Sequence, residues 1–224
     1  RLTESVEWTG PDGLTTLVTT YTYDAHGRVT SHTDSTDLVL ATEYNSRGRV
    51  AAEEDALGRR TEFDYDVFGR LARKRFPDGT EETYQYDAED RRTHVTDRAG
   101  RTTEYHYNSL NRLTEIIHPD GATTSFQYDL AGRLTATTDG NGNLTQWVLD
   151  AAGRRIARTD AMGRQTTMER DANGNLIAET DPNGHTTTWT FDGNNRPTRT
   201  TFADGTETAT TYDHAGRPLS MTDE

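Results

Sequence analysis

The sequence contains no cysteine among its 224 residues, and large apolar side chains are sparse. The absence of cysteine excludes disulfide bonds and thiolate metal sites. Hydrophobic residues make up 31% of the chain and the mean hydropathy is −0.93, which is low for a globular protein with a thick core. No apolar run approaches the roughly 18–20 residues that a membrane-spanning helix needs. The sequence therefore predicts no membrane span.

Positive charge is also in the minority, because 24 Lys and Arg stand against 37 Asp and Glu, for a formal net charge of −13. Nucleic-acid binding requires clustered Lys and Arg, so this balance argues against nucleic acid as the main partner. Low hydropathy with high net charge is also typical of disordered chains. The regular placing of the aromatic residues favours a folded chain instead.

What the sequence does contain is one motif that recurs at a fixed step of 21 residues. It is clearest in Tyr65–Leu71, which reads YDVFGRL. A fixed period in the 20–50 range indicates a repeat architecture, which offers a surface or a container rather than one catalytic cleft. We expect one continuous domain with an irregular lead-in over residues 1–22, nine repeats over 23–211 and a partial tenth over 212–224. The first motif position is occupied, without insertion or deletion, by Tyr23, Tyr44, Tyr65, Tyr86, Tyr107, Tyr128, Leu149, Arg170, Phe191 and Tyr212.

Each repeat contains two turns. In the first turn the aromatic position is followed by Asp or Asn in all ten copies, and the fifth motif residue is always Gly, Asn or Asp. These residue types tolerate a positive φ best, so the pattern predicts a left-handed residue there in every copy. The sixth residue is Arg in nine copies. The second turn reads D-x-x-G, as in Asp55–Gly58, which suits a type I turn, or ends in Asp-Gly, as in Phe76–Gly79.

The segments between turns have about six to eight residues, which is strand length and too short for helices. Before the tyrosine, Phe63 and Tyr65 share one face while Glu62 and Asp64 share the other. Two strands per repeat make an all-β, repetitive antiparallel ribbon of β-hairpins, and so wide a sheet should curl. The segment after the first turn is more polar and predicts a strand less strongly. Aromatic residues of successive hairpins are expected to stack into ladders.

The Y-D-x-x-G-R-L pattern at this step resembles the Rhs family, also called YD-repeat proteins. The resemblance implies a curled segment of a larger hollow β-shell. Bacterial members are polymorphic toxins or toxin-complex subunits whose shell encloses a C-terminal toxic domain, and the animal teneurins use a similar shell in cell adhesion. The residues assigned to the structural repeat motif are Tyr23, Asp24, Gly27, Arg28, Tyr44, Gly48, Arg49, Tyr65, Asp66, Gly69, Arg70, Tyr86, Asp87, Tyr107, Arg112, Tyr128, Asp129, Gly132, Arg133, Gly153, Arg154, Tyr212, Asp213, Gly216 and Arg217.

The resemblance implies a non-catalytic segment of shell that encapsulates and helps deliver a C-terminal toxin domain, in a secreted or cell-surface protein. The expected partners are further repeats of the same polypeptide, the enclosed toxin domain, and secretion-system or cell-surface proteins. We find no self-cleavage segment or toxin domain, and Arg1 and Glu224 fall inside the pattern, so an internal stretch of shell wall is expected. The alternative is an extracellular or cell-surface module that binds carbohydrate or protein through exposed aromatic rings.

No group of residues matches a known reactive site. The Asp-rich turns, such as Asp139–Asn143, do not match the EF-hand calcium loop, and turn chemistry explains them. The seven histidines show no metal-binding spacing, and no pair of carboxylates is singled out as a glycosidase would require. The sequence therefore predicts no enzyme, no cofactor, no metal and no catalytic residue.

The repeated Asp and Arg of the first turn, for example Asp66 and Arg70, allow two interpretations. They could form exposed ion pairs, which contribute about 0–1 kcal/mol each. Alternatively, the arginine could bond carbonyl or carboxylate groups of the neighbouring hairpin and so fix its register.

Overall fold

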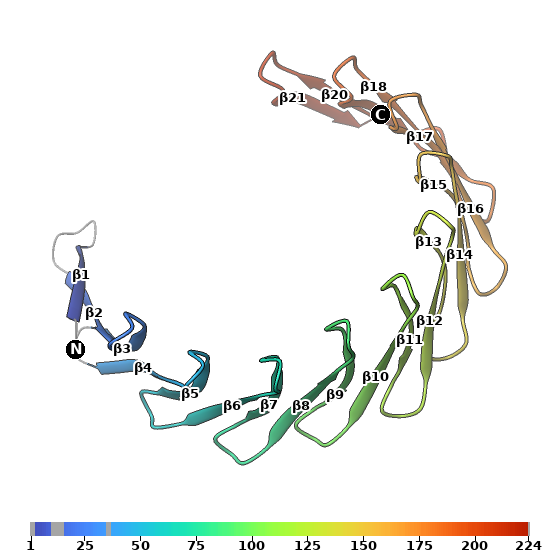
Figure 1. Cartoon of the computed structure of the whole chain (residues 1–224). Coiled ribbons are helices and arrows are strands. Elements are labelled where there is room, and N and C mark those ends of the chain that lie inside the picture. The colour runs from blue at the N-terminus through green and yellow to red at the C-terminus, as the bar shows by residue number, and fades with distance from the viewer. Residues whose placement is uncertain (1–2, 10–15, 35–36, 224) are drawn as a thin grey trace. The chain divides into compact units, whose positions relative to one another are not determined.

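The computed structural model describes residues 3–9, 16–34 and 37–223, and it divides the chain into two compact units (Figure 1). Unit 1 is Arg1–Tyr105 and unit 2 is His106–Glu224. All the regular structure in the described ranges is β-strand. The predicted all-β ribbon of antiparallel hairpins is therefore confirmed. Within each unit successive hairpins change direction steadily, so the ribbon bends (Figure 1).

In unit 1 each strand pairs antiparallel with the next one along the chain. Residues 10–15, which belong to the lead-in expected over residues 1–22, lie outside the described residues. The strands are β1 (Thr3–Thr9), β2 (Thr16–Tyr23), β3 (Val29–Asp34), β4 (Asp37–Tyr44), β5 (Val50–Asp55), β6 (Arg60–Tyr65), β7 (Leu71–Arg75), β8 (Glu81–Tyr86), β9 (Arg92–Thr96) and β10 (Thr102–Tyr107), whose last two residues belong to unit 2.

Unit 2 continues the same pattern, and each strand from β11 onward pairs antiparallel with the next. The more polar segments also form strands. The strands are β11 (Leu113–Ile117), β12 (Thr123–Tyr128), β13 (Leu134–Thr138), β14 (Leu144–Leu149), β15 (Arg155–Thr159), β16 (Gln165–Arg170), β17 (Leu176–Thr180), β18 (Thr186–Phe191), β19 (Pro197–Thr201), β20 (Glu207–Tyr212) and β21 (Pro218–Asp223).

Both kinds of turn have the same backbone geometry. In the turn after Tyr65, the Gly69 N–H donates to Asp66 O at 3.0 Å and the Asp66 N–H donates to Arg70 O at 2.9 Å. The strand register then slips by one residue. This is a type I turn followed by a left-handed residue and a bulge. The second turns repeat these two hydrogen bonds, whether they read D-x-x-G or end in Asp-Gly.

The predicted left-handed residue is present in all ten copies of the first turn. Where glycine is replaced, Asp90, Asn111 and Asn195 have φ values of 63°, 61° and 60°. The glycine copies have φ values from 76° to 93°. The restriction to Gly, Asn and Asp therefore reflects backbone conformation.

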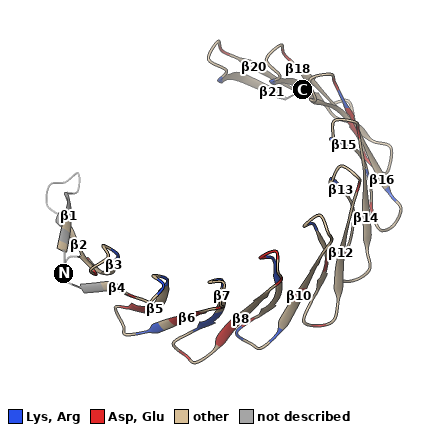
Figure 2. Cartoon of the chain, viewed as in Figure 1, with Lys and Arg blue, Asp and Glu red and all other residues tan. Residues whose placement is uncertain are grey.

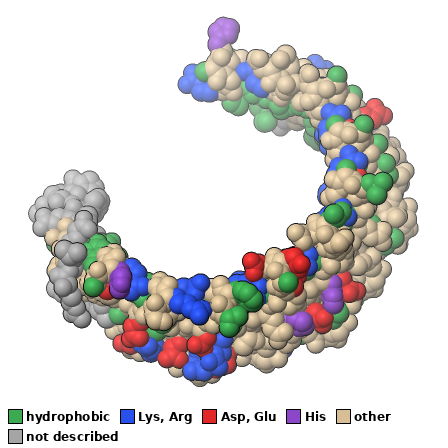
Figure 3. Space-filling view, viewed as in Figure 1, with side chains coloured by type: hydrophobic (Ala, Val, Ile, Leu, Met, Phe, Trp, Pro, Cys, Tyr) green, Lys and Arg blue, Asp and Glu red, His purple; other side chains and the backbone are tan. Residues whose placement is uncertain are grey.

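The ribbon has almost no apolar core. Among described residues only Ala52, Ala136 and Ala157 are buried, and no large side chain is fully enclosed. On the visible face the hydrophobic side chains form small separate areas between charged ones (Figure 3). Stability therefore has to come from backbone pairing and from polar side-chain contacts between hairpins.

Candidate structural site: the tyrosine turn

Backbone pairing is longer between two strands joined by a tyrosine turn than between strands of successive hairpins. This difference determines which contacts the motif residues can make. Strands β4 and β5 are paired down to Tyr44 and Val50, beside the tyrosine turn that joins them. Strands β5 and β6 belong to successive hairpins, and they pair over only three residue pairs, the last being Ala52 with Glu62. The neighbouring hairpins therefore separate toward their tyrosine turns, and side chains make the contact there.

The aspartate of the motif closes its own turn. Asp66 Oδ1 accepts the N–H groups of Phe68 at 3.0 Å and Arg70 at 2.9 Å. Its other oxygen, Oδ2, accepts Arg70 Nε at 2.7 Å. Asp24 and Arg28 repeat the arrangement at 3.0 and 2.7 Å. The hydrogen bond from the Arg28 side chain lowers the pKa of Asp24 to about 2.

The tyrosine bridges to the preceding hairpin. Tyr65 Oη donates to the carbonyl oxygen of Val50 at 2.8 Å, a group that lies beyond the last β5–β6 pair. A partly buried carbonyl without a donor is unfavourable, so this hydroxyl supplies the donor that the ladder does not. The same bond, to a residue 15 positions earlier, is made by Tyr44, Tyr86, Tyr128 and Tyr212.

The arginine bridges to the following hairpin. The Arg70 guanidinium lies over the Tyr86 ring with its carbon 4.7 Å from the ring centre, and Arg70 Nη1 donates to Asp87 O at 2.8 Å. Arg112 repeats both contacts with the next hairpin, at 5.0 Å to Tyr128 and 3.1 Å to Asp129 O. We call the tyrosine hydroxyl bond and these two arginine contacts the inter-repeat clasp.

The left-handed residue receives the arginine of the preceding repeat. A Cβ placed on Gly69 would collide with Arg49 Nη2, so the guanidinium rests directly on the glycine backbone. Where this residue is Asp90, Arg70 Nη1 instead bonds its Oδ1 at 2.7 Å. Gly at this position thus serves both the positive φ and the close approach of the arginine.

Copies that depart from the motif keep part of the clasp. Arg170 stands at the tyrosine position, and its Nε donates to Arg155 O at 3.4 Å, which replaces the hydroxyl bond. Asn175 stands at the arginine position and donates to both Asp171 Oδ2 at 2.9 Å and Asn195 Oδ1 at 2.8 Å. Other polar side chains therefore span the same boundary through hydrogen bonds.

The two interpretations of the motif arginine both describe real contacts. Arg70 pairs with Asp66 of its own turn and bonds the neighbouring hairpin. The expected stacking of ring on ring is wrong for five of the motif tyrosines, because a guanidinium of the preceding repeat occupies the space over the ring. It does so at Tyr44, Tyr65, Tyr86, Tyr128 and Tyr212.

Unit 1 also carries a charge network that the sequence patterns do not predict, and Figure 2 shows residues of both charges along β6 to β8. Its side chains come from β4 and β6 to β8, and each is about 36–62% exposed. Exposed pairs of this kind contribute little individually. The pairs are Glu43–Arg60 at 2.7 Å, Arg60–Glu62 at 3.3 Å, Glu62–Arg75 at 3.1 Å, Arg75–Glu81 at 2.9 Å, Arg73–Glu81 at 3.7 Å and Arg73–Asp64 at 2.6 Å.

The described residues contain no group of three or more His, Asp or Glu side chains placed to hold a metal ion. Over the same ranges, no helix is long and apolar enough to cross a membrane.

Sequence comparison decides the family. The teneurin YD-shell family model matches residues 32–221, and the RHS repeat model matches residues 1–37. The chain belongs to the teneurin YD-shell family. No curated protein matches this YD-shell chain in sequence.

Solved structures share its fold. The Photorhabdus luminescens Tc holotoxin pore aligns with a TM-score of 0.52 and 16% identity over 94% of this YD-shell chain. The TcdB2-TccC3 structure without the hypervariable C-terminal region aligns with a TM-score of 0.55 and 17% identity over 99% of it. A further TcdB2-TccC3 crystal structure gives 0.53 and 16% over 97%. The chain spans only 14–15% of the length of these three neighbours.

Proposed function

We propose that this chain is a non-catalytic segment of shell wall in a secreted or cell-surface protein, and that the shell encloses and helps deliver a C-terminal toxin domain. The observation that carries the proposal is that the polar atoms of the motif bond to other parts of the ribbon. The Tyr65 hydroxyl, the Asp66 carboxylate and the Arg70 guanidinium all bond within the turn or to a neighbouring hairpin. The motif residues therefore serve to hold hairpins together in a continuous wall, and their polar groups are already engaged.

The fold shared with toxin-complex chains supports enclosure as the purpose of that wall. One of those structures lacks a hypervariable C-terminal region, which is consistent with a variable domain that follows a constant shell. The proposed partners of this chain are further repeats of the same polypeptide and such a C-terminal domain.

The alternative, a module that binds carbohydrate through its aromatic residues, has less support. Sugars stack on the open face of a ring, whereas Arg28 covers Tyr44 at 4.4 Å and Arg155 covers Trp147 at 4.5 Å. The tyrosine hydroxyls are already bonded to backbone carbonyls. A glycan array in which specific binding is lost in Trp147→Ala and Trp189→Ala would favour this alternative.

The test compares enclosure in the full-length protein with and without the clasp. The triple variant Arg70→Ala, Arg112→Ala, Arg133→Ala removes three arginines that bond the next hairpin. The readout is proteolysis of the domain that follows the shell, followed by mass spectrometry. We expect that domain to resist protease in the wild type and to be digested in the triple variant.

The control removes three arginines from second turns: Arg59→Ala, Arg101→Ala, Arg164→Ala. Each has the same ion pair with the aspartate four residues earlier and lies outside the clasp. This variant should protect the domain as the wild type does. Rapid digestion of the domain in the wild type would contradict enclosure, and protection that persists in the clasp variant would contradict the role given to the clasp.

A further inference from the structure

The tyrosine turn between β4 and β5 differs from the other nine in its charge. Its first residue is Asn45 where most copies have aspartate, and its third is Arg47, a position that holds no other arginine or lysine in the chain. Arg49 follows two residues later. This turn therefore carries two arginine side chains and no carboxylate.

Arg49 lacks the aspartate partner that most of its equivalents have. Asn45 Oδ1 already accepts the N–H groups of Arg47 at 2.9 Å and Arg49 at 3.0 Å, and an amide cannot neutralise a guanidinium. The Arg49 side chain makes no hydrogen bond or ion pair with any described residue, and its Nη1 is buried without an acceptor. A shielded charge without a counter-charge is unfavourable, so a negatively charged group beside Arg49 would stabilise this turn.

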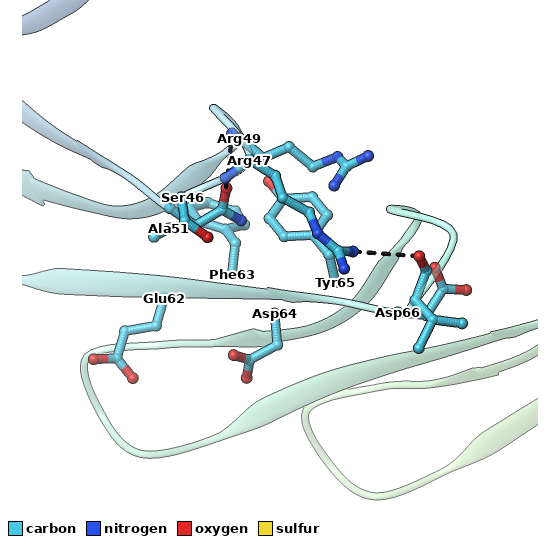
Figure 4. Close-up of a pocket in the computed structure, with 11 residues that line it drawn as sticks. Ser46, Arg47, Arg49, Ala51, Glu62, Phe63, Asp64, Tyr65 and Asp66 are labelled. Carbon is cyan, nitrogen blue, oxygen red and sulfur yellow. Dashed lines mark hydrogen bonds between the residues drawn. The ribbon is translucent and has the colours of Figure 1, made fainter.

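An open groove of about 580 Å³ lies between this turn and the next hairpin (Figure 4). Arg47, Arg49, Tyr65 and Asp66 are among the residues that line it. The Arg47 side chain makes one hydrogen bond, from Nη1 to Val67 O at 3.3 Å. Both arginines can therefore turn donors toward a ligand in the groove.

The carboxylates around the groove do not compensate this charge. Asp66 is paired with Arg70 at 2.7 Å, and Asp64 with Arg73 at 2.6 Å. Glu62, which also lines the groove, is paired with arginines at 3.3 and 3.1 Å. Figure 4 shows Glu62 and Asp64 extending to the side of β6 opposite Arg47 and Arg49. The two arginines are thus an uncompensated pair of positive charges.

We propose that this groove binds a small oxyanion of the phosphate type, with Arg49 as the main ligand and Arg47 as the second. A planar guanidinium offers parallel N–H donors that match two oxygens of such an anion. The anion supplies in this turn the negative charge that aspartate supplies in others, and it thereby stabilises the contact between the β4–β5 and β6–β7 hairpins. Any ligand that binds only the folded state also raises the melting temperature.

The decisive variant is Asn45→Asp. It should place a carboxylate on Arg49 as Asp24 and Asp66 do on Arg28 and Arg70, so the fold is kept while the anion site is filled internally. The matched control is Asn108→Asp. Arg112 in that turn also has a buried nitrogen without an acceptor, but Leu110 stands where Arg47 would be, so this turn lacks the second cation.

The measurement titrates residues 1–224 with inorganic phosphate at constant ionic strength, following the melting temperature and the arginine Nε–H signals by NMR. We expect a saturable rise in melting temperature and a shift of the Arg49 signal in the wild type and in Asn108→Asp. Asn45→Asp should abolish both, and Arg47→Gln should weaken binding about tenfold, as expected for one lost charge-assisted hydrogen bond.

Two results would overturn the proposal. One is a wild type that responds to phosphate no more than to sodium chloride of equal ionic strength. The other is a phosphate response that persists unchanged in Asn45→Asp.

Discussion

Tyr65 Oη donates a 2.8 Å hydrogen bond to the carbonyl oxygen of Val50, at a point where the ladder between β5 and β6 has already ended. The tyrosine side chain therefore continues the contact between the two strands beyond the point where their backbone pairing ends. Because the bond joins residues 15 apart in successive repeats, it fixes one hairpin relative to the one before it. The 21-residue step of the sequence is the period of this contact.

The first prediction concerns that bond. Tyr65→Phe keeps the ring and removes the hydroxyl that makes this hydrogen bond. The substitution should therefore destabilise the fold by about 0.5–1.5 kcal/mol, as for a typical hydrogen bond. Chemical denaturation measures the change. Tyr105→Phe is the control, because the Tyr105 hydroxyl bonds no described residue, and it should change stability by less than about 0.5 kcal/mol. Equal effects of the two substitutions would contradict the role given to the hydroxyl.

The second prediction separates the clasp arginine from an ordinary ion pair. Arg70→Ala removes the contact with the Tyr86 ring and the bond to Asp87 O as well as the pair with Asp66. We expect a loss of about 1–2 kcal/mol, the sum of a cation–π contact and a charge-assisted hydrogen bond at a partly exposed site.

The matched control for Arg70 is Arg59→Ala. Arg59 has the same ion pair with the residue four positions earlier, but its side chain is 64% exposed and is not part of the clasp. Its removal should cost about 0.3–0.5 kcal/mol. If thermal denaturation shows the two variants to be equally stable, the arginine does not hold the hairpins together.

The turns could be predicted from the sequence because local chemistry decides them. A position that admits only Gly, Asn and Asp has few explanations besides a positive φ, and the structure has one there in all ten copies. The strands follow from the short segments between turns and their alternation. The clasp could be predicted only in part, since spacing suggests that an arginine reaches the next hairpin but not that it covers a ring.

The charge network could not be predicted from the sequence because of the bulge beside the tyrosine turn. Period-two alternation puts Leu71 and Arg73 on one face, but the register slips by one residue, and Arg73 pairs with Asp64 while Leu71 pairs with Tyr65. Arg73 thus reaches the face of Asp64, where the two form an ion pair. A pattern read without the bulge assigns these residues to the wrong side of the sheet.

The third prediction distinguishes backbone strain from close approach. Gly58 and Gly69 both have positive φ values, 72° and 89°, but a Cβ on Gly58 would meet nothing within 4 Å. Gly58→Ala should therefore cost only the left-handed strain of about 1–2 kcal/mol. Gly69→Ala should cost about 0.5–1 kcal/mol more, because Arg49 has to leave the Tyr65 ring.

Asparagine provides the control for strain. Asn111 and Asn195 hold the left-handed conformation in their own turns, so Gly58→Asn should be close to neutral in thermal denaturation. If Gly58→Ala proves as costly as Gly69→Ala, the arginine does not rest on the glycine.

The fourth prediction is a loss of stability in acid that comes from the turn aspartates. The hydrogen bond from Arg28 holds the pKa of Asp24 at about 2, against an ordinary value of 3.8, and the Arg101 side chain likewise lowers the pKa of Asp97. A folded-state pKa below the unfolded one means that the stabilisation is complete above about pH 4 and is lost as the pH falls toward 2.

The test for the acid effect is the melting temperature as a function of pH, compared between the wild type and the double variant Asp24→Asn, Asp97→Asn. Asparagine keeps the turn, as Asn45 and Asn108 show by accepting the same backbone N–H groups, but it cannot titrate. The variant should be less stable at neutral pH and should lose less on acidification. Because these pairs are solvent-exposed, added salt should shrink the difference. Parallel curves for the two proteins would show that the acid sensitivity has another source.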